Sequence, residues 1–502
     1  MSAAEQTLHE YLELMKKMKA YEEALGVLYW DMRTGAPRKG LEQRSEAVGV
    51  LSSELFRLGT SERMGELLAA LSEPSVFAGL SRIHQRSVEE NKKEYERSVK
   101  IPPEMYQKYV VLTSQAEAVW EEAKGNNDFA MFRPYLEQVV DYTKQFVELW
   151  GYQENKYDTL LDSFEPGMTV GQLDKVFGEL RDRLVPLVAA VAEKKPPNTS
   201  FLSRKVPKER QKALSEYILK EIGYDFQAGR LDATVHPFAT GLNPGDVRVT
   251  TRYIEDDFKN SLFSTIHEGG HALYEQNISP ELIGTNLCTG TSMGIHESQS
   301  RLWENMIGRS REFWERYYGD FQRMIPEFSD ISLDEFYVAI NEAKASLIRT
   351  EADELTYNLH IMIRYELEKL LINDQLKVAD LPEAWNEKYK DYLGIVPPND
   401  QLGVLQDVHW SGGGFGYFPS YALGNMYAAQ MMHAMKQAIP SFDEHVRSGS
   451  FGPIREWLTE KIYKHGRVLT PSEVIRNTAG AELDPSFLTD YLQRKFSEIY
   501  KL

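Results

Sequence analysis

The stretch His267-Glu268-Gly269-Gly270-His271 places the narrowest limits on what this chain can be. On a helix, residues four apart lie on one face, one turn above each other, so the two imidazoles can bind a single metal ion. Glu268 lies beside them on the adjoining side of the same turn. This H-E-x-x-H spacing predicts two zinc ligands and a carboxylate that can take a proton from water bound to the metal.

The sequence around the motif predicts a helix from Asp256 to Asn277 independently of the motif. Asp256 and Asp257 suit its N-terminal end, where the helix dipole favours anions. The apolar residues of this segment recur at helical spacing, at Leu262, Phe263, Ile266 and Leu273.

Gly269 and Gly270 are unexpected inside such a helix, because each glycine costs about 1 kcal/mol relative to alanine. Two glycines beside the histidines indicate that another group approaches the backbone closely. A substrate chain is the interpretation that the neighbouring motif favours.

A catalytic zinc ion usually has three protein ligands and keeps one position for water or substrate. Glu297 is the preferred third ligand, since it follows His271 by 26 residues and lies near the start of the next predicted helix. His296 is its rival and Glu304 a weaker one. Glu275 lies one turn further along the same helix as the histidines, so its carboxylate is not expected to reach the ion that they bind.

The composition limits the partners and the compartment. A hydrophobic content of 42% and a charged content of 26% are typical of a globular protein with a substantial core. A net charge of -18 argues against a nucleic-acid partner, and no run of about 18 apolar residues predicts a membrane span. Cys288 is the only cysteine, which fits a reducing compartment, and the first residues lack the pattern of a signal peptide. We therefore expect a cytoplasmic protein.

Most of the chain has helical periodicity. The predicted helices cover residues 7–31, 41–58, 61–73, 76–100, 103–124, 129–162, 169–194, 207–222, 256–277, 312–323, 333–373 and 382–393, with a further helix opening near residue 295 and more after residue 417. The glycine-rich turn of residues 411–416 is not a phosphate loop, because no Gly-Lys-Ser/Thr follows it. We expect it to let a substrate-covering segment move.

One strand is predicted just before the metal helix. Apolar or β-branched residues alternate with polar ones at Val247, Val249, Thr251 and Tyr253. An open strand edge at this place can hold an extended peptide by backbone pairing. A short structural hairpin is the alternative.

Six motifs between residues 236 and 410 resemble those of the carboxypeptidase Taq family of metallocarboxypeptidases. They are His236-Pro237-Phe238, Asp246-x-Arg248-x-Thr250, His267-Glu268-x-x-His271, His296-Glu297-Ser298-Gln299, Ile348-Arg349-x-x-Ala352-Asp353 and Gly403-x-x-Gln406-Asp407-x-His409-Trp410. The motifs occur in the order of the family and agree with it at their defining positions. The zinc motif alone is shared by many metallopeptidases, whereas the six together are specific.

The resemblance implies a mainly α fold, similar to that of the neurolysin-like peptidases, with a deep substrate groove and a small β element near the zinc helix. We expect residues 1–502 to form a single catalytic unit. Its N-terminal helical part, about 1–200, and its metal-site part, about 230–430, would flank the groove, and the C-terminal helices would complete it. The family pattern also implies a homodimer.

The implied activity is the release of single amino acids from the C-terminus of peptides, with broad specificity and poor acceptance of proline. The implied cofactor is one Zn2+ per chain, for which Co2+ can substitute. By the family pattern His267, His271 and Glu297 are the ligands, and Glu268 is the general base and acid.

The oxyanion of the reaction needs a donor besides the metal. His409 and Tyr421 are the candidates, because paired His and Tyr groups serve this role in the neurolysin-like enzymes. Tyr417 is the nearest competitor of Tyr421.

An exopeptidase must also bind the free carboxylate of its substrate. A planar guanidinium can do so with paired hydrogen bonds, and the family motifs supply Arg349 and Arg248. Arg349 could instead form an exposed ion pair with Asp353, four residues later on the predicted helix. His236 and Gln406 are expected to line the substrate-binding end of the groove.

We therefore predict a cytoplasmic, metal-dependent carboxypeptidase. An oligoendopeptidase or a dipeptidyl carboxypeptidase on the same zinc site is the first alternative. A non-catalytic helical binding scaffold is the second.

Overall fold

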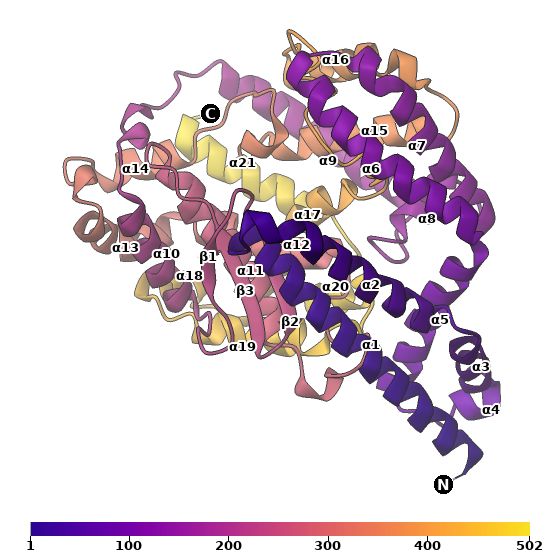
Figure 1. Cartoon of the computed structure of the whole chain (residues 1–502). Coiled ribbons are helices and arrows are strands. Elements are labelled where there is room, and N and C mark those ends of the chain that lie inside the picture. The colour runs from indigo at the N-terminus through magenta and orange to yellow at the C-terminus, as the bar shows by residue number, and fades with distance from the viewer. Residues whose placement is uncertain (1) are drawn as a thin grey trace.

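The computed structural model describes residues 2–502 and consists mainly of helices, which confirms the predicted fold class (Figure 1). The first part of the chain contains α1 (Ala3–Thr34), α2 (Leu41–Gly59), α3 (Glu62–Leu71), α4 (Pro74–Phe77), α5 (Arg82–Lys100), α6 (Pro103–Asn126), α7 (Phe129–Trp150), α8 (Lys156–Leu161), α9 (Val170–Ala192) and α10 (Lys208–Ile222).

The sheet and the remaining helices follow. They are β1 (Leu231–Ala233), β2 (Ala239–Asn243), β3 (Asp246–Thr251), α11 (Phe258–Gln276), α12 (Met293–Arg301), α13 (Arg311–Met324), α14 (Leu333–Ile340), α15 (Tyr357–Ile372), α16 (Leu381–Leu393), α17 (Pro419–Ala438), α18 (Phe442–Ser448), α19 (Gly452–Lys461), α20 (Pro471–Ala479) and α21 (Ser486–Tyr500). A single π-helical segment, η4 (Leu302–Ile307), continues α12 within the described part of the chain.

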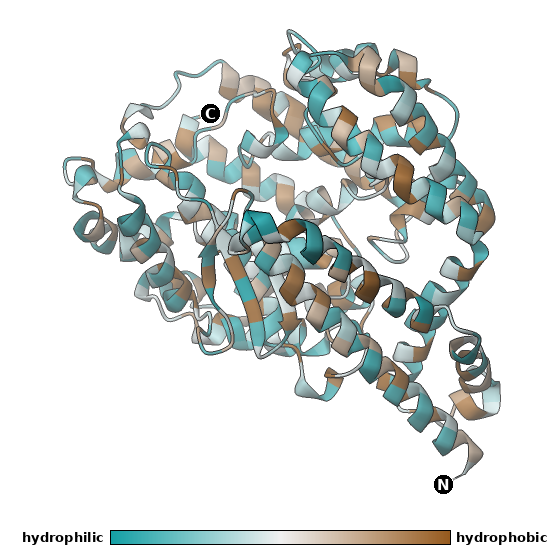
Figure 2. Ribbon diagram, viewed as in Figure 1, coloured by the Kyte–Doolittle hydropathy of each residue, from teal (hydrophilic) through white to brown (hydrophobic). Residues whose placement is uncertain are grey.

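Helices α1 and α2 lie side by side across the front of the molecule, before the strands (Figure 1). Helices α6, α7, α15 and α16 gather in one part of the molecule, and α11 and α12 lie at its centre (Figure 1). Figure 2 shows polar and apolar bands alternating along the helices, as expected where each helix buries one face.

The buried apolar side chains form two clusters in the described residues. The larger extends from Leu112 in α6 to Tyr500 in α21 and surrounds the central helices. The smaller lies between α1, α3 and α5, where Tyr11 and Met15 pack against Met64 and Val88. The helices that surround the metal motif therefore share one core with α6–α9.

The three strands are ordered β1-β3-β2, with β1 parallel and β2 antiparallel to β3. The predicted strand is confirmed as β3, although Tyr253 lies beyond its end. Val247 and Val249 point into the core and are fully buried. Strand β2 is an edge strand of this sheet, and it contacts both α1 and α11.

Two predicted helices are interrupted by short breaks. Residues 76–100 divide because α4 ends at Phe77 and Ser81 caps the start of α5 with its side chain. Residues 129–162 divide at Gly151, whose φ of 88° no helix can contain.

The predicted helix 333–373 is wrong between residues 341 and 356, where the chain is irregular apart from the short turn Arg349–Glu351. Side chains take the backbone donors that a helix would have used. Asp353 accepts hydrogen bonds from the backbone N–H groups of Lys344, Leu355 and Thr356, and Gln406 accepts one from that of Arg349. Arg349 and Asp353 therefore share no helix face, and the alternative of an ion pair between them is wrong, since Arg349 pairs with Asp407.

Among residues 2–502, no helix combines the length and the apolar character that crossing a bilayer requires.

Candidate active site

Helix α11 and helix α12 bring the three predicted metal ligands together. His267 Nε2 and His271 Nε2 lie 3.5 and 3.4 Å from Glu297 Oε2, and the three ligand atoms all lie within 4.8 Å of one another. Ligands about 2.0–2.1 Å from a tetrahedral zinc ion are about 3.3–3.4 Å apart. Two imidazoles and one carboxylate at these separations fit a catalytic zinc site.

The residues weighed as rivals of Glu297 lie behind the two histidines. Glu304 Oε2 is 2.9 Å from His267 Nδ1. His296 Nδ1 is 2.7 Å from His271 Nδ1, and His296 Nε2 is 2.8 Å from Glu275 Oε1. These contacts hold both imidazoles with Nε2 turned toward Glu297. Such outer partners fix the orientation and raise the basicity of metal-binding histidines.

The hydrogen bonds around His271 indicate which of its ring nitrogens carries the hydrogen. With Nε2 facing the metal group, Nδ1 of His271 carries the hydrogen and donates it to His296 Nδ1. His296 Nε2 then donates to Glu275, whose carboxylate also accepts from the backbone of Gly290. Burial lowers the pKa of His271 to about 4, which keeps the ring neutral and able to bind a cation.

The glycine pair has a structural cause, and the interpretation of a substrate approaching it is wrong. A Cβ atom at Gly270 would lie 2.6 Å from the carbonyl oxygen of Gln299 and 2.7 Å from Cα of Ser300. A Cβ atom at Gly269 would lie 2.7 Å from the side chain of Leu219 in α10. Gly270 lets α12 approach α11 closely enough for Glu297 to reach the two histidines, and Gly269 lets α10 pack against the other side of α11.

Glu268 is 8% exposed and lies next to the metal group. Burial raises the pKa of its carboxyl group to about 7, opposed by His267 and reinforced by the carboxylates of Glu297 and Glu304. The backbone N–H of Ala239, at the start of the edge strand β2, also faces this carboxyl group and lowers its pKa. The edge strand therefore lies beside the predicted base.

His409, Tyr417 and Tyr421 lie together, although the glycine-rich turn 411–416 separates His409 from the two tyrosines. The ring centroids of His409 and Tyr417 are 5.5 Å apart, and those of Tyr417 and Tyr421 are 5.1 Å apart. Burial lowers the pKa of His409 to about 4, so its ring is neutral at pH 7 and has one N–H to donate. Burial raises the pKa of Tyr417, and the Glu297 carboxylate adds to this. The three rings thus form one cluster around the ends of the turn 411–416.

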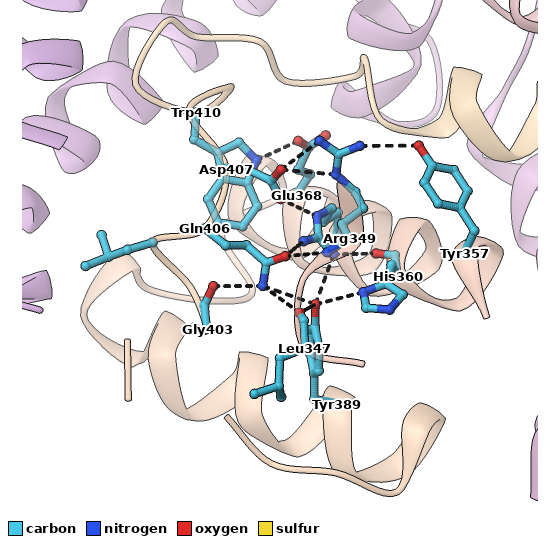
Figure 3. A network of polar contacts seen from close by, with 12 residues as sticks. Leu347, Arg349, Tyr357, His360, Glu368, Tyr389, Gly403, Gln406, Asp407 and Trp410 are labelled. Atoms are coloured by element: carbon cyan, nitrogen blue, oxygen red, sulfur yellow. Dashed lines mark hydrogen bonds and ion pairs between the residues drawn. The ribbon is translucent and has the colours of Figure 1, made fainter. Parts of the chain in front are cut away.

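Arg349 and Gln406 belong to a buried polar network (Figure 3). Asp407 Oδ1 accepts from Arg349 Nε and Nη2 at 3.0 and 2.8 Å, and Asp407 Oδ2 accepts from Arg364 Nε at 2.6 Å. Gln406 accepts from the Arg349 backbone and from Arg364, and its amide donates to Leu347. The network joins the irregular segment 341–356 to the segment that carries His409.

Arg248 and His236 lie on the strand side of the site. Arg248 donates to Asp246 at 2.8 and 2.7 Å, and its guanidinium lies 4.7 Å from the ring centroid of Trp30 in α1. His236 is exposed in the loop between β1 and β2 and has no hydrogen-bond partner among the described residues. Neither side chain contacts the metal group in this structure.

The glycine-rich turn 411–416 is packed closely rather than loosely held. A Cβ atom at Gly413 would lie 1.8 Å from the Tyr109 hydroxyl, and Gly416 has a φ of 91° against the backbone of Leu160. Glu368 accepts from the backbone N–H of Gly416 at 2.9 Å and from Trp410 Nε1 at 2.6 Å. Gly413 and Gly416 are therefore required by close packing and by their backbone conformations.

Sequence reasoning did not identify Glu368 as a support of this turn. The signal was weak, because a glutamate inside α15 looks like any surface residue of a helix until its burial is known. Its accepted hydrogen bonds, with a third from the Tyr157 hydroxyl at 2.5 Å, fix the segment between Trp410 and Gly416. The turn that follows His409 is therefore held in place from α15.

Comparisons with known proteins match nearly the whole chain. The model of the carboxypeptidase Taq (M32) metallopeptidase family matches residues 10–496. Carboxypeptidase 1 of Bacillus subtilis is 55% identical over 495 residues, covering 98% of each chain. Thermostable carboxypeptidase 1 of Thermus thermophilus is 41% identical and covers 99% of each chain.

Solved structures show the same fold. The crystal structure of BsuCP has a TM-score of 0.91 at 54% identity and covers 99% of this chain and 100% of its own. The M32 carboxypeptidase from Deinococcus radiodurans R1 has a TM-score of 0.96 at 38% identity, with coverage of 99% and 100%. The predicted family is confirmed: this chain belongs to the carboxypeptidase Taq (M32) family and is a metallocarboxypeptidase whose metal-binding group is His267, His271 and Glu297.

Proposed function

We propose that the protein removes single amino acids from the C-terminus of peptides, with broad specificity and poor acceptance of proline. We propose one Zn2+ per chain, with Co2+ as a working substitute, because the nitrogen and oxygen donor set suits both ions. When bound, the metal supplies Lewis-acid activation of water and of the scissile carbonyl group. The observation that carries this proposal is the position of buried Glu268 beside the three converging ligands.

Glu268 acts as the general base and then as the general acid. Its carboxylate takes a proton from the attacking water and returns it to the amine of the departing amino acid. A pKa of about 7 is well matched to both transfers at neutral pH. The neighbouring positive charge of a bound dication would lower this pKa and favour the base form.

His409 and Tyr421 are proposed to stabilise the oxyanion, with Tyr417 as the alternative to Tyr421. Neutral His409 can donate one N–H, and burial raises the pKa of Tyr421, which keeps its hydroxyl protonated. Burial also raises the pKa of Tyr417, with the Glu297 carboxylate adding to this, so its hydroxyl too stays protonated and can donate. Comparing Tyr417→Phe with Tyr421→Phe separates the two, because the true donor lowers kcat with little effect on KM.

Arg349, Arg248, His236 and Gln406 remain predictions for substrate binding. The guanidinium groups of Arg349 and Arg248 are in ion pairs with carboxylates of the protein. Either arginine would have to exchange that partner for the substrate carboxylate. The contacts of Gln406 support a role in holding the segment before His409 in place.

Glu268→Gln tests the proposed mechanism. The amide is nearly isosteric and leaves the three ligands in place, so bound zinc measured by atomic emission should stay at one ion per chain. Peptide hydrolysis should fall by about three orders of magnitude or more, because the base is lost. Unchanged hydrolysis with full zinc content would remove Glu268 from the mechanism and leave the ligand assignment intact.

An oligoendopeptidase or a dipeptidyl carboxypeptidase is the remaining alternative for the substrate class. The names of the similar proteins, carboxypeptidase 1 and thermostable carboxypeptidase 1, support removal from the C-terminus. A non-catalytic scaffold would show no metal-dependent peptide hydrolysis that the Glu268→Gln change could reduce.

We also propose that the protein is a homodimer in the cytoplasm. Phe56 of α2 and Tyr106 of α6 are exposed and stack with centroids 5.8 Å apart, which gives these two helices an apolar surface that a second copy can cover. Light scattering coupled to size exclusion tests the dimer, and Phe56→Lys should shift it toward monomer. Cell fractionation tests the compartment.

A further inference from the structure

Arg301, the last residue of α12, lies one helical turn after the metal ligand Glu297 and contacts it directly. Its Nε donates to Glu297 Oε1 at 2.6 Å. Only 14% of the Arg301 side chain and 7% of the Glu297 side chain are exposed. An arginine is effectively always protonated. The metal ligand therefore carries a permanent cation against one of its two oxygens.

The two carboxylate oxygens of Glu297 have different partners. Oε2 lies 3.5 and 3.4 Å from the Nε2 atoms of His267 and His271, whereas Oε1 contacts Arg301. The Ser300 hydroxyl lies 2.9 Å from Oε2 and 2.7 Å from the Glu297 carbonyl oxygen, so its single hydrogen can go to the backbone. One oxygen thus faces the imidazoles, and a charge-assisted hydrogen bond engages the other.

This division limits how Glu297 can bind a metal ion. A carboxylate can bind an ion through one oxygen or through both. If both oxygens of Glu297 bound the ion, they would occupy the position that a catalytic zinc ion keeps for water or substrate. Turning Oε1 toward the ion would break its hydrogen bond with Arg301, and such bonds are strong in a site of low dielectric.

The guanidinium of Arg301 is itself fixed on two further sides. Its Nη1 lies 3.4 Å from Glu304 Oε2, and its Cζ lies 4.5 Å from the ring centroid of Tyr357. A planar guanidinium can stack on an aromatic ring and donate in its own plane at the same time, which a lysine ammonium group cannot do. These contacts favour an arginine at this position.

The contacts of Arg301 also reach the first metal ligand. Glu304 Oε2, which Arg301 approaches, lies 2.9 Å from His267 Nδ1. Glu297, Arg301 and Glu304 follow one another at spacings of four and three residues, along α12 and its π-helical continuation η4. Single π-helical turns of this kind are frequent at functional sites. One continuous helical element therefore carries the third ligand, its cation and the partner of His267.

We propose that Arg301 is a positioning residue that acts through Glu297. It keeps the carboxylate as a one-oxygen ligand and so keeps the fourth coordination position of the metal ion open. Because Arg301 also takes up part of the carboxylate charge, the ion keeps more of its strength as a Lewis acid. The inference rests on a divalent ion held by His267, His271 and Glu297, and it does not depend on which peptides are cleaved.

The visible absorption spectrum of the Co2+-loaded protein tests this role without turnover. Coordination geometry is diagnostic, because the bands weaken when a four-coordinate Co2+ ion becomes five-coordinate. The wild type should give the intense spectrum of a four-coordinate ion. Arg301→Ala should give a spectrum several-fold weaker, since Glu297 then binds through both oxygens. X-ray absorption at the zinc edge checks the same change in the number of oxygen neighbours.

Chemical rescue makes the test specific for the missing cation. Arg301, Glu304 and Tyr357 line a cavity of about 320 Å³, which has room for a small cation once the arginine side chain is removed. Methylguanidinium, at concentrations too low to unfold the protein, should restore the intense Co2+ spectrum of Arg301→Ala. Urea has a similar planar shape and N–H donors but no charge, and it should restore little.

Two further variants separate Arg301 from its surroundings. Arg309→Ala removes another cation of the same cavity, one that donates to Glu304, and it should keep the intense spectrum. Arg301→Lys keeps the charge and should recover part of kcat. In Arg301→Ala, kcat should fall about 10–100-fold while KM stays within about threefold. Thermal unfolding of each variant verifies that the fold is retained.

The outcomes decide between positioning and general support of the fold. Loss of intensity or of the ion in Arg301→Ala that methylguanidinium reverses and urea does not would support the proposal. An unchanged spectrum would overturn it, and so would a loss that neither compound or both compounds reverse. The proposed role of Glu268 stands in every case, because Glu268→Gln tests it separately.

Discussion

Glu304 Oε2 lies 2.9 Å from His267 Nδ1, on the side of the imidazole opposite to the nitrogen that faces the metal group. Arg301 and Arg309 hold the same carboxylate, and together with His267 they lower the pKa of Glu304 to about 2. Burial opposes this lowering and is outweighed. Glu304 therefore stays ionised and accepts the hydrogen of His267 Nδ1. This leaves the lone pair of His267 Nε2 available to the metal.

Glu304→Ala is predicted to weaken zinc binding about 10–100-fold, because the ring of His267 loses its orienting partner. Competition with a chromogenic chelator at fixed pH measures the affinity. Glu351→Ala, at the rim of the neighbouring cavity, removes an exposed carboxylate and serves as the control. Equal affinities of the two variants would show that the contact with His267 contributes nothing to the site.

Gly270→Ala is predicted to destabilise the protein by about 1–3 kcal/mol and to weaken metal binding, because the new methyl group meets the backbone of α12. Gly178→Ala in α9 is the matched control, since nothing lies within 4 Å of its Cβ position. That change should stabilise by up to about 1 kcal/mol through helix propensity. Urea unfolding measures both, and a stabilised Gly270→Ala protein would refute the packing explanation.

Asp407→Ala is predicted to cost about 3–5 kcal/mol, because it leaves Arg349 and Arg364 buried without a counter-ion. It should also lower kcat, since His409 follows two residues later. Asp246→Ala removes a similar aspartate–arginine pair at a more exposed place and should cost at most about 1 kcal/mol. Denaturant unfolding compares the two, and equal costs would contradict the importance of burial in the network of Figure 3.

Glu368 predicts a dependence of stability on pH. Burial raises its pKa from 4.5 to about 7 in the folded protein, so between these values the folded state binds more protons than the unfolded state. The contribution of this group to stability is therefore full below pH 4.5 and is lost as the pH rises to 7. The loss is about 3 kcal/mol at most.

Glu368→Gln removes this titration. The free energy of unfolding of the variant, relative to wild type, should rise by up to about 3 kcal/mol between pH 4.5 and pH 7. Glu179→Gln changes an exposed glutamate of α9 and serves as the control. A flat difference for Glu368→Gln would mean that the carboxyl group is ionised throughout this range.

The ligand set could be predicted from sequence because each of its parts is local. The spacing of His267 and His271 follows from one helix, and the family motif supplied Glu297. The roles of Glu304 and His296 could not be predicted, because they depend on how α12 and its π-helical continuation lie against α11. Gly270 permits that approach, but a glycine pair in the sequence does not say which element packs against it.

The segment 341–356 shows where the prediction of secondary structure from the sequence failed. Its apolar residues continue the helical spacing of α14, so a helix was the natural prediction. The competing hydrogen bonds come partly from Asp353 within the segment and partly from Gln406, 57 residues after Arg349. A partner this distant cannot be found from local periodicity, and Asp407 as the counter-ion of Arg349 was missed for the same reason.

The most direct test of the account is the mass spectrum of products from one mixed-sequence peptide, offered with a free and with an amidated C-terminus. We predict a ladder of products from the free acid, each shorter by one C-terminal residue, that stops at proline. It should disappear with a chelator and return with zinc. The amide should stay intact. Ready internal cleavage of the amide, or release of dipeptides, would contradict the assignment as a carboxypeptidase of single residues.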